Sequence, residues 1–269
     1  MNAPVRNPRQ MGFTLLELLI ATVVFLLICG AIFGLLDLAQ KNYGSETQIS
    51  SSFQEARLAV DQIVSDFDQA GYPSLSMFSE VPAMTSRYAF GPVAWWPGYT
   101  NNPPTPCQVG TAGGGTCIPS PGDFDMIVET TSGATVMWIR YQLIGTTLYR
   151  SVVPKTQGAD PTAATSTPDV MVPFIVNVMN NPPGGQLGEL IATYPSVYPG
   201  GQPVPTFQFS CDSQAGSVPC PTAAPGGLST QIRDVDVTLI VRTTQRDLQT
   251  QKWKLVELSG RGHRANPDN

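Results

Sequence analysis

The chain has 269 residues, of which 42% are apolar and 13% charged, so it can fold around a sizeable hydrophobic core. Its formal net charge is −5, and its 15 Lys and Arg residues form no basic run. Because phosphate backbones are bound by clustered Lys and Arg, this composition argues against a nucleic-acid partner. Gly and Pro number 25 each and are concentrated after residue 72, which favours a loop-rich β domain there.

The N-terminal region contains a segment long enough to cross a membrane. Residues 18–36 carry no charged side chain. At about 1.5 Å per residue, a helix of this length spans the roughly 30 Å hydrocarbon core of a bilayer. Arg6 and Arg9 lie within residues 1–12, which contain no acidic residue, so the positive-inside rule places the N-terminus in the cytoplasm. A cleaved secretory signal peptide is the alternative, but its apolar region is typically only about 7–15 residues long.

The helical pattern continues beyond the membrane segment. Between residues 49 and 67, apolar side chains recur at alternating spacings of four and three, which places them on one face of a helix. This stripe consists of Ile49, Phe53, Ala56, Val60, Ile63 and Phe67. The Gly and Pro of "AGYP", residues 70–73, are typical of a helix end. The pattern predicts one helix over about 13–70, with its second half packed on a globular domain.

The chain after Tyr72 is expected to be rich in β structure. Segments of β-branched and aromatic residues alternate with short turns that contain Gly, as in antiparallel hairpins. The expected strands are residues 124–130, 134–143, 146–153, 170–178, 190–194, 206–210, 231–243 and 252–258. The predicted fold is therefore α+β: a long N-terminal helix packed on an antiparallel β-sheet domain with long loops.

Alternation within the strand at 231–243 predicts which of its side chains are buried. Val235, Val237 and Leu239 are expected to face the core, and Asp234 and Asp236 to face solvent. Two segments that are low in charge and rich in Pro, Gly and Thr are expected to be exposed connections. These segments are residues 156–168 and 180–205.

Four of the five cysteines form two closely spaced pairs. Cys107 and Cys117 flank one short loop, and Cys211 and Cys220 flank another. In an oxidising compartment we expect two local disulfides, although four cysteines allow three pairings. Cys29 lies in the membrane segment and is expected to act as a small apolar residue.

The sequence contains no pattern typical of an enzyme. It has a single histidine, His263, and no nucleophile, phosphate-binding or metal-ligand motif, so no cofactor and no metal are expected. Two carboxylate pairs, Asp66 with Asp68 and Asp123 with Asp125, are interpreted as solvated surface. Calcium binding stays open for them, although their spacing is not that of an EF-hand.

An aromatic segment between residues 90 and 107 is a candidate contact surface. Trp95, Trp96 and Tyr99 lie there among several prolines, and exposed aromatic side chains are typical of recognition surfaces. The same side chains could equally fill the base of the sheet.

The stretch "GFTLLELLIA", residues 12–21, resembles the prepilin N-terminal motif of type IV pilins and type II secretion pseudopilins. That motif is a short basic leader, a Gly, a Phe and a long apolar helix with Glu at its fifth mature position. The resemblance implies that a prepilin peptidase cleaves after Gly12 and methylates the new amine of Phe13. The protein would then be a substrate of that enzyme and not itself an enzyme.

Weaker similarity extends into the rest of the chain. Residues 55–73, 169–178 and 232–247 resemble the large minor pilins of the PilW type and, less closely, the J-type pseudopilins. The resemblance implies four parts: a cytoplasmic leader (1–12), a transmembrane helix (13–36), an amphipathic helix (37–72) and a periplasmic β-rich domain (73–269).

Glu17 is the one charged residue inside the apolar segment. A charged side chain there costs free energy on insertion and usually has a partner. In the resembling family the glutamate is thought to meet the N-terminal amine of a neighbouring subunit during assembly. For this chain the amine would be that of Phe13. A carboxylate that only sits at the headgroup level is the alternative.

The resemblance implies a minor pilin, anchored in the inner membrane, that primes assembly of a type IV pilus or caps it. Its expected partners are other minor and major pilins, the prepilin peptidase, the inner-membrane assembly platform and membrane lipid. A type II secretion minor pseudopilin is the closest alternative. A membrane-tethered adhesin or ligand-binding protein is an alternative of another class, and it would not need Gly12 or Glu17.

Overall fold

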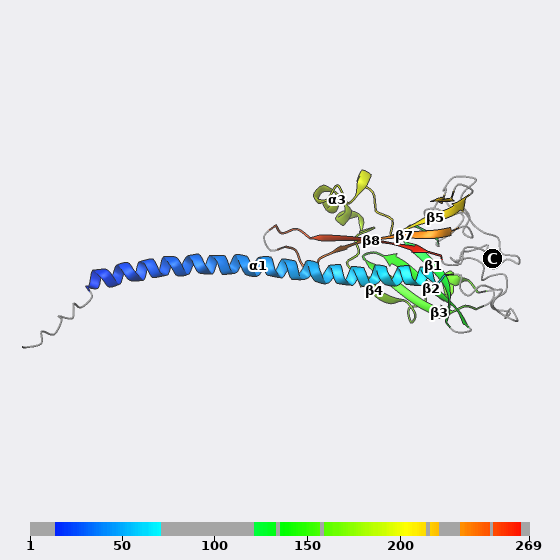
Figure 1. Cartoon of the computed structure of the whole chain (residues 1–269), viewed down its shortest axis with the longest axis horizontal. Coiled ribbons are helices and arrows are strands. Elements are labelled where there is room, and N and C mark those ends of the chain that lie inside the picture. The colour runs from blue at the N-terminus through cyan, green and yellow to red at the C-terminus, as the bar shows by residue number, and fades with distance from the viewer. Residues whose placement is uncertain are drawn as a thin grey trace, which may run out of the picture.

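The computed structural model describes residues 14–70, 121–132, 135–156, 159–213, 216–220, 232–247 and 250–264. One long helix, α1 (Leu15–Asp68), extends from a β-rich domain and lies along it over its C-terminal part (Figure 1). The α+β architecture predicted from the sequence is confirmed. The helix ends agree with the predicted range of 13–70 to within two residues.

The two halves of α1 differ in their surroundings. The large apolar side chains between Leu15 and Leu38 are all exposed, whereas Ala56, Ile63 and Phe67 are fully buried. The prediction for Phe53 is wrong, because its side chain is 41% exposed. The buried face passes through the neighbouring positions instead, since the period of 3.6 residues rotates it away from a strict alternation of four and three. Its members are Ser52, Ala56, Ala59, Val60, Ile63, Asp66 and Phe67.

The first sheet is an antiparallel meander in the order β1-β2-β3-β4. Its strands are β1 (Asp125–Ser132), β2 (Thr135–Ile144), β3 (Thr147–Pro154) and β4 (Val172–Val176). Gly145, with φ of +60°, opens the two-residue turn between β2 and β3, where a positive φ is required of the first residue. The first three strands lie within two residues of their predicted ranges.

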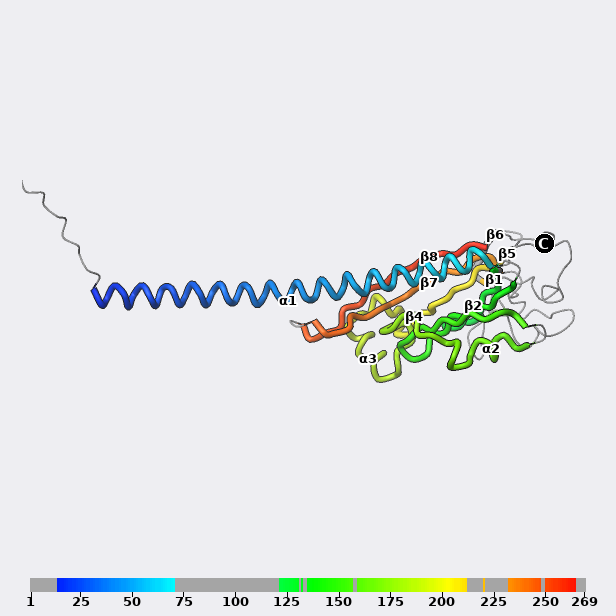
Figure 2. Tube along the Cα trace, turned by 90° about the horizontal axis from the view of Figure 1, so that it is seen from below, coloured from blue at the N-terminus to red at the C-terminus, as the bar shows by residue number. Residues whose placement is uncertain are grey.

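The second sheet has the order β6-β5-β7-β8 and is also antiparallel. Its strands are β5 (Phe207–Ser213), β6 (Gly216–Pro219), β7 (Ile232–Arg242) and β8 (Leu255–His263). The sequence pattern predicted strands in the regions of β5, β7 and β8 but missed β6, and it predicted one sheet where the structure has two. Both sheets pack against the C-terminal half of α1 (Figures 1 and 2).

The main hydrophobic core joins α1 to both sheets. Ile63 comes from the helix, Met126 and Tyr141 from the first sheet, and Val235 and Leu239 from the second. The inward orientation predicted for the apolar residues of β7 is therefore correct. The helix is an integral part of the core and cannot leave it without exposing buried apolar surface.

A close approach of β8 to α1 depends on two glycines. A β-carbon at Gly260 would lie 2.5 Å from Cγ1 of Val60, and one at Gly262 would lie 3.0 Å from the ring of Phe67. A contact of 2.5 Å is too short for two carbon atoms. The helix side chains therefore rest directly on the backbone of the strand.

The predicted connection at 180–205 has structure of its own. It contains α3 (Gly184–Thr193) and a short 3-10 helix, Pro199–Gly201, so the strand predicted over 190–194 is wrong. The helix forms because its apolar side chains repeat at helical spacing and pack on a small second core. The residues of this core are Met179, Leu190, Tyr198 and Ile240, with Leu187 and Ile191 beside them. The connection at 156–168 likewise contains the short helix α2 (Pro161–Ala164).

Candidate functional site

The beginning of α1 is closed by a reciprocal pair of hydrogen bonds between Thr14 and Glu17. The backbone N–H of Glu17 donates to Thr14 Oγ1 at 3.2 Å, and the backbone N–H of Thr14 donates to Glu17 Oε2 at 3.1 Å. This is a capping box, which satisfies two of the backbone donors that a helix start leaves free. The Glu17 carboxylate therefore folds back onto Thr14 at the helix start. Gly12 and Phe13 lie outside the described residues.

The first half of α1 has the properties of a membrane anchor. Within the described residues, α1 is the one helix long and apolar enough to cross a bilayer. None of the residues in its most apolar stretch is buried in the protein. Cys29 has a free thiol and is partly exposed on this part of the helix. An exposed apolar surface of this length needs lipid or other helices around it, which fits a single-pass membrane anchor.

The buried end of α1 is held by a carboxylate. Asp66 is 7% exposed, and its Oδ2 accepts hydrogen bonds from the Tyr141 hydroxyl at 2.5 Å and from Arg150 Nη2 at 2.8 Å. Gln62 donates to the other oxygen at 2.8 Å. Burial and the Asp66 carboxylate raise the pKa of Tyr141. The interpretation of Asp66 as solvated surface is wrong, because it connects the helix to β2 and β3.

The second carboxylate pair also differs from its prediction. Asp125 is 6% exposed and forms a bidentate ion pair with Arg140, at 2.9 Å to Nε and 2.5 Å to Nη2. Arg140 also donates to the Thr162 carbonyl at 3.1 Å and to the Ser166 hydroxyl. This ion pair ties β1 and β2 to the α2 segment, so its role is structural.

One further ion pair is buried, and a hydrogen bond from Trp138 supports it. Lys155 Nζ lies 3.3 Å from Glu129 Oε2, and the indole N–H of Trp138 donates to the other oxygen of Glu129 at 2.9 Å. Burial raises the pKa of Glu129 and lowers the pKa of Lys155. A carboxylate and an amine with shifts in these directions occur at catalytic sites, but this pair lies inside the sheet with both side chains almost completely covered. We therefore assign it to the core.

Asp234 of β7 and His263 of β8 lie opposite each other on the two paired strands. The prediction that Asp234 faces solvent is wrong, because it is 2% exposed and lies 2.7 Å from Arg261 Nη2 and in contact with the imidazole of His263. The backbone N–H of His263 donates to Asp68 at 2.7 Å. The only histidine of the chain thus takes part in contacts between the helix and the sheet.

Of the cysteines, Cys211 and Cys220 are joined by a disulfide, with their Cα atoms 4.9 Å apart. The bond ties the end of β6 to β5. Cys107 and Cys117, as well as Trp95, Trp96 and Tyr99, lie outside the described residues. Their pairing and exposure stay predictions.

Non-reducing peptide mapping is expected to recover two linked peptide pairs, one joining Cys107 to Cys117 and one joining Cys211 to Cys220. Cys29 should be recovered as a free thiol, since it lies on the apolar half of α1. A bridge across a loop of this size contributes roughly 2–3 kcal/mol in the chain-entropy model. Recovery of a peptide linking Cys107 to Cys211 would contradict the local pairing.

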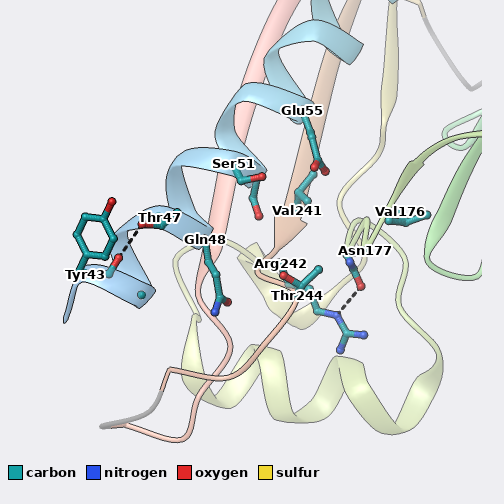
Figure 3. Close-up of a pocket in the computed structure, with 12 residues that line it drawn as sticks. Tyr43, Thr47, Gln48, Ser51, Glu55, Val176, Asn177, Val241, Arg242 and Thr244 are labelled. Atoms are coloured by element: carbon teal, nitrogen blue, oxygen red, sulfur yellow. Dashed lines mark hydrogen bonds between the residues drawn. The ribbon is translucent and has the colours of Figure 1, made fainter. Parts of the chain in front are cut away.

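A cavity of about 490 Å³ lies where α1 leaves the globular domain (Figure 3). Tyr43, Thr47 and Gln48 line it from the helix, and Asn177 and Arg242 line it from the domain. Arg242 Nε donates to Asn177 Oδ1 at 3.2 Å. Hydroxyl and amide side chains share the lining with a larger apolar surface, and these residues form no catalytic pairing of side chains there. Among the described residues there is also no group of three or more His, Cys, Asp or Glu that could hold a metal ion.

Comparison with known proteins gives one match. Residues 7–33 match the prokaryotic N-terminal methylation motif, which covers the end of the predicted leader and the apolar start of α1. No curated protein and no solved structure matches the chain. The motif marks a substrate of a prepilin peptidase and supports a type IV pilin-like or pseudopilin protein that assembles with other pilins.

Proposed function

We propose that the protein is a minor pilin that is anchored in the inner membrane and primes assembly of a type IV pilus or caps it. The observation that carries the proposal is the methylation motif at residues 7–33, placed at the start of an exposed apolar helix. That helix continues without a break into the core of the globular domain. A helix of this form can leave the bilayer and pack against the same helices of other subunits while the domain stays attached.

In this proposal Gly12 and Phe13 form the cleavage site, and Phe13 carries the methylated amine. The Glu17 carboxylate accepts a hydrogen bond from the backbone N–H of Thr14, the residue that follows Phe13 in the sequence. Opposite charges are strongly attracted where water is scarce, so the carboxylate of one subunit and the amine of its neighbour would set the axial register. Arg6 and Arg9 support an orientation with the leader in the cytoplasm and the β domain in the periplasm.

The size of the globular region supports a minor role. The described helices and strands between residues 121 and 264 form a bulky domain beside the helix (Figure 1). Such a domain would be difficult to repeat along a thin filament. A position at the tip or in the priming complex needs only one or a few copies.

A type II secretion pseudopilin is the second candidate, because the same motif serves both systems and the described structure is compatible with either. The two candidates differ in the system that assembles the subunits, a pilus or a type II secretion system. Both use the same kind of N-terminal membrane helix. The phenotype of a deletion strain separates them.

Deletion of the gene is expected to reduce the number of surface pili, since a subunit that primes assembly acts at the start of each filament. The protein should be rare relative to the major pilin in sheared pili, as measured by quantitative mass spectrometry. Its dominance in the filament would contradict the minor role. Normal piliation combined with loss of protein secretion would favour the pseudopilin.

A further inference from the structure

The hairpin formed by β7 and β8 reaches further along α1 towards Leu15 than the rest of the described globular domain (Figures 1 and 2). Hydrogen bonds to side chains of α1 fix the position of the hairpin along the helix axis. Ser45 Oγ donates to Asp247 Oδ2 at 2.9 Å, and the backbone N–H of Gln245 donates to Gln48 Oε1 at 3.3 Å. The end of the hairpin therefore lies level with residue 45 of the helix.

This position is close to the surface of the membrane that α1 would span. Ser45 lies nine positions after Leu36, the last residue of the uncharged segment, which corresponds to about 13 Å along the helix. The headgroup layer beyond the hydrocarbon core is roughly 5–7 Å thick on each side. The remaining gap of about 6–8 Å is no larger than the Debye length of about 8 Å at physiological ionic strength. Charges on the hairpin are therefore only partly screened from the lipid surface.

The hairpin is basic although the chain as a whole is acidic. Residues 242–254 contain four basic side chains, Arg242, Arg246, Lys252 and Lys254, and one acidic side chain, Asp247. Lys254 lies 3.9 Å from Asp247, and Arg246 lies 3.6 Å from Glu189 of α3. Lys252 is exposed. The hairpin thus keeps an excess of positive charge after its own ion pairs are formed.

Two of these cationic side chains pack on the ring of Trp253. The guanidinium groups of Arg242 and Arg246 lie over its ring, at 4.2 and 5.2 Å from the ring centre. The Tyr194 hydroxyl donates to the Trp253 carbonyl and so ties this part of the hairpin to the end of α3. Burial and the positive charge of Arg246 lower the pKa of Arg242. Two like charges beside one ring are stabilised by an anion that approaches both.

We propose that the β7–β8 hairpin binds the phosphates of anionic phospholipids in the membrane that anchors α1. Trp, Arg and Lys are the side chains that membrane interfaces favour, because they combine apolar surface with charge or hydrogen-bond donors. Together with α1, this second contact would hold the domain at a defined angle to the bilayer before the subunit enters a filament. The inference depends on the membrane-anchored function proposed above.

The full chain in lipid nanodiscs provides the test. Amide hydrogen exchange of residues 250–258 is compared in nanodiscs of phosphatidylcholine alone and in nanodiscs with 30% phosphatidylglycerol. We expect exchange to be at least about threefold slower with the anionic lipid, since a basic residue near such a surface shifts binding about fivefold. The difference should vanish in 1 M NaCl, where the Debye length is about 3 Å.

Charge reversal separates the hairpin from general electrostatics. Lys252→Glu should abolish the difference between the two lipids, whereas Arg57→Glu should keep it. Arg57 is an exposed residue of α1 and lies 21 positions after Leu36, about 32 Å beyond it. Unchanged exchange in β1 and β2 reports that both variants are folded.

Equal exchange in the two lipids, or a difference that survives Lys252→Glu, would overturn the proposal. Slower exchange with inorganic phosphate in phosphatidylcholine nanodiscs, equal to that with anionic lipid, would assign the site to free phosphate and also overturn it. Failure of the chain to remain with the nanodiscs at all is a different result. It would refute the membrane anchor itself.

Discussion

Replacing Glu17 with Ala is expected to leave the protein cleaved and membrane-bound but to reduce its incorporation into pili about tenfold or more. The change removes a charge from the membrane segment, so insertion is not impaired. In the filament, however, the amine of a neighbouring subunit would lack a counter-charge among packed apolar helices. An unpaired ion in that environment costs several kcal/mol, and each 1.4 kcal/mol is a factor of ten. Cross-linking to the other pilins and pilus number are the quantities to measure.

Two further variants distinguish the charge of Glu17 from its place in the capping box. Glu17→Gln keeps the hydrogen bonds to Thr14, because Gln also serves at this position of a capping box, but it removes the charge. Thr14→Ala removes the cap and keeps the charge. Assembly should fail for Glu17→Gln and persist for Thr14→Ala, and the reverse pattern would assign Glu17 to helix capping alone.

Cleavage has its own control. A bulky residue at Gly12 should block the prepilin peptidase and leave a species longer by the leader in the inner membrane. This variant should be missing from pili for a different reason, because it has no free amine at Phe13. Immunoblots of membrane fractions separate the two defects by size. If Glu17→Ala were not cleaved, the carboxylate would be needed for recognition by the peptidase, and its pairing with a neighbour's amine would not explain the defect.

Replacing Arg140 with Leu is expected to lower the free energy of unfolding by about 3–5 kcal/mol at pH 7. It leaves the Asp125 carboxylate buried without its bidentate partner, which is among the most destabilising changes inside a protein. Urea unfolding of the detergent-solubilised chain, followed by far-UV circular dichroism, measures the loss. Arg57→Leu is the matched control, because its contact with Asp61 is 3.8 Å long and both side chains are 68% exposed. It should cost less than about 1 kcal/mol.

The loss should depend on pH with a definite sign. Burial raises the pKa of Asp125, and Arg140 opposes that rise in the wild type. In Arg140→Leu only the burial remains, so the folded-state pKa lies above the unfolded value of about 3.9. A raised carboxyl pKa gives stability that is present below the unfolded pKa and is lost as pH rises through the folded pKa. The variant should therefore approach wild-type stability near pH 4, and a loss that is independent of pH would contradict this account.

Much of α1 could be predicted because its signals are local. The apolar segment, the amphipathic stripe and the Gly and Pro after Asp68 each fix a part of the helix without any tertiary information. The strands of the first sheet followed from β-branched residues and short turns in the same way. The division of all the strands into two sheets could not be predicted, since it depends on which strand edges pair across long connections.

The buried charges were missed for a different reason. Asp66 lies three positions after Ile63 and one before Phe67, so its spacing already put it on the buried face of the helix. Asp66 was nevertheless interpreted as solvated surface because its side chain is charged. Partners such as Tyr141 and Arg150 are far along the chain, and no local pattern connects them with Asp66. The helix at 184–193 was missed because its Gly-rich beginning resembles a loop, although Leu187, Leu190 and Ile191 carry helical spacing.

The attachment of α1 to β8 has a mechanical consequence. The helix and the strand run side by side (Figures 1 and 2), and Val60 and Phe67 touch the backbone at Gly260 and Gly262 two turns apart. A pull on the exposed apolar half travels along the helix axis and loads these contacts simultaneously, in shear. Peeling would break them one at a time. The domain is therefore built to resist tension transmitted through its own anchor far better than a sideways force of equal size.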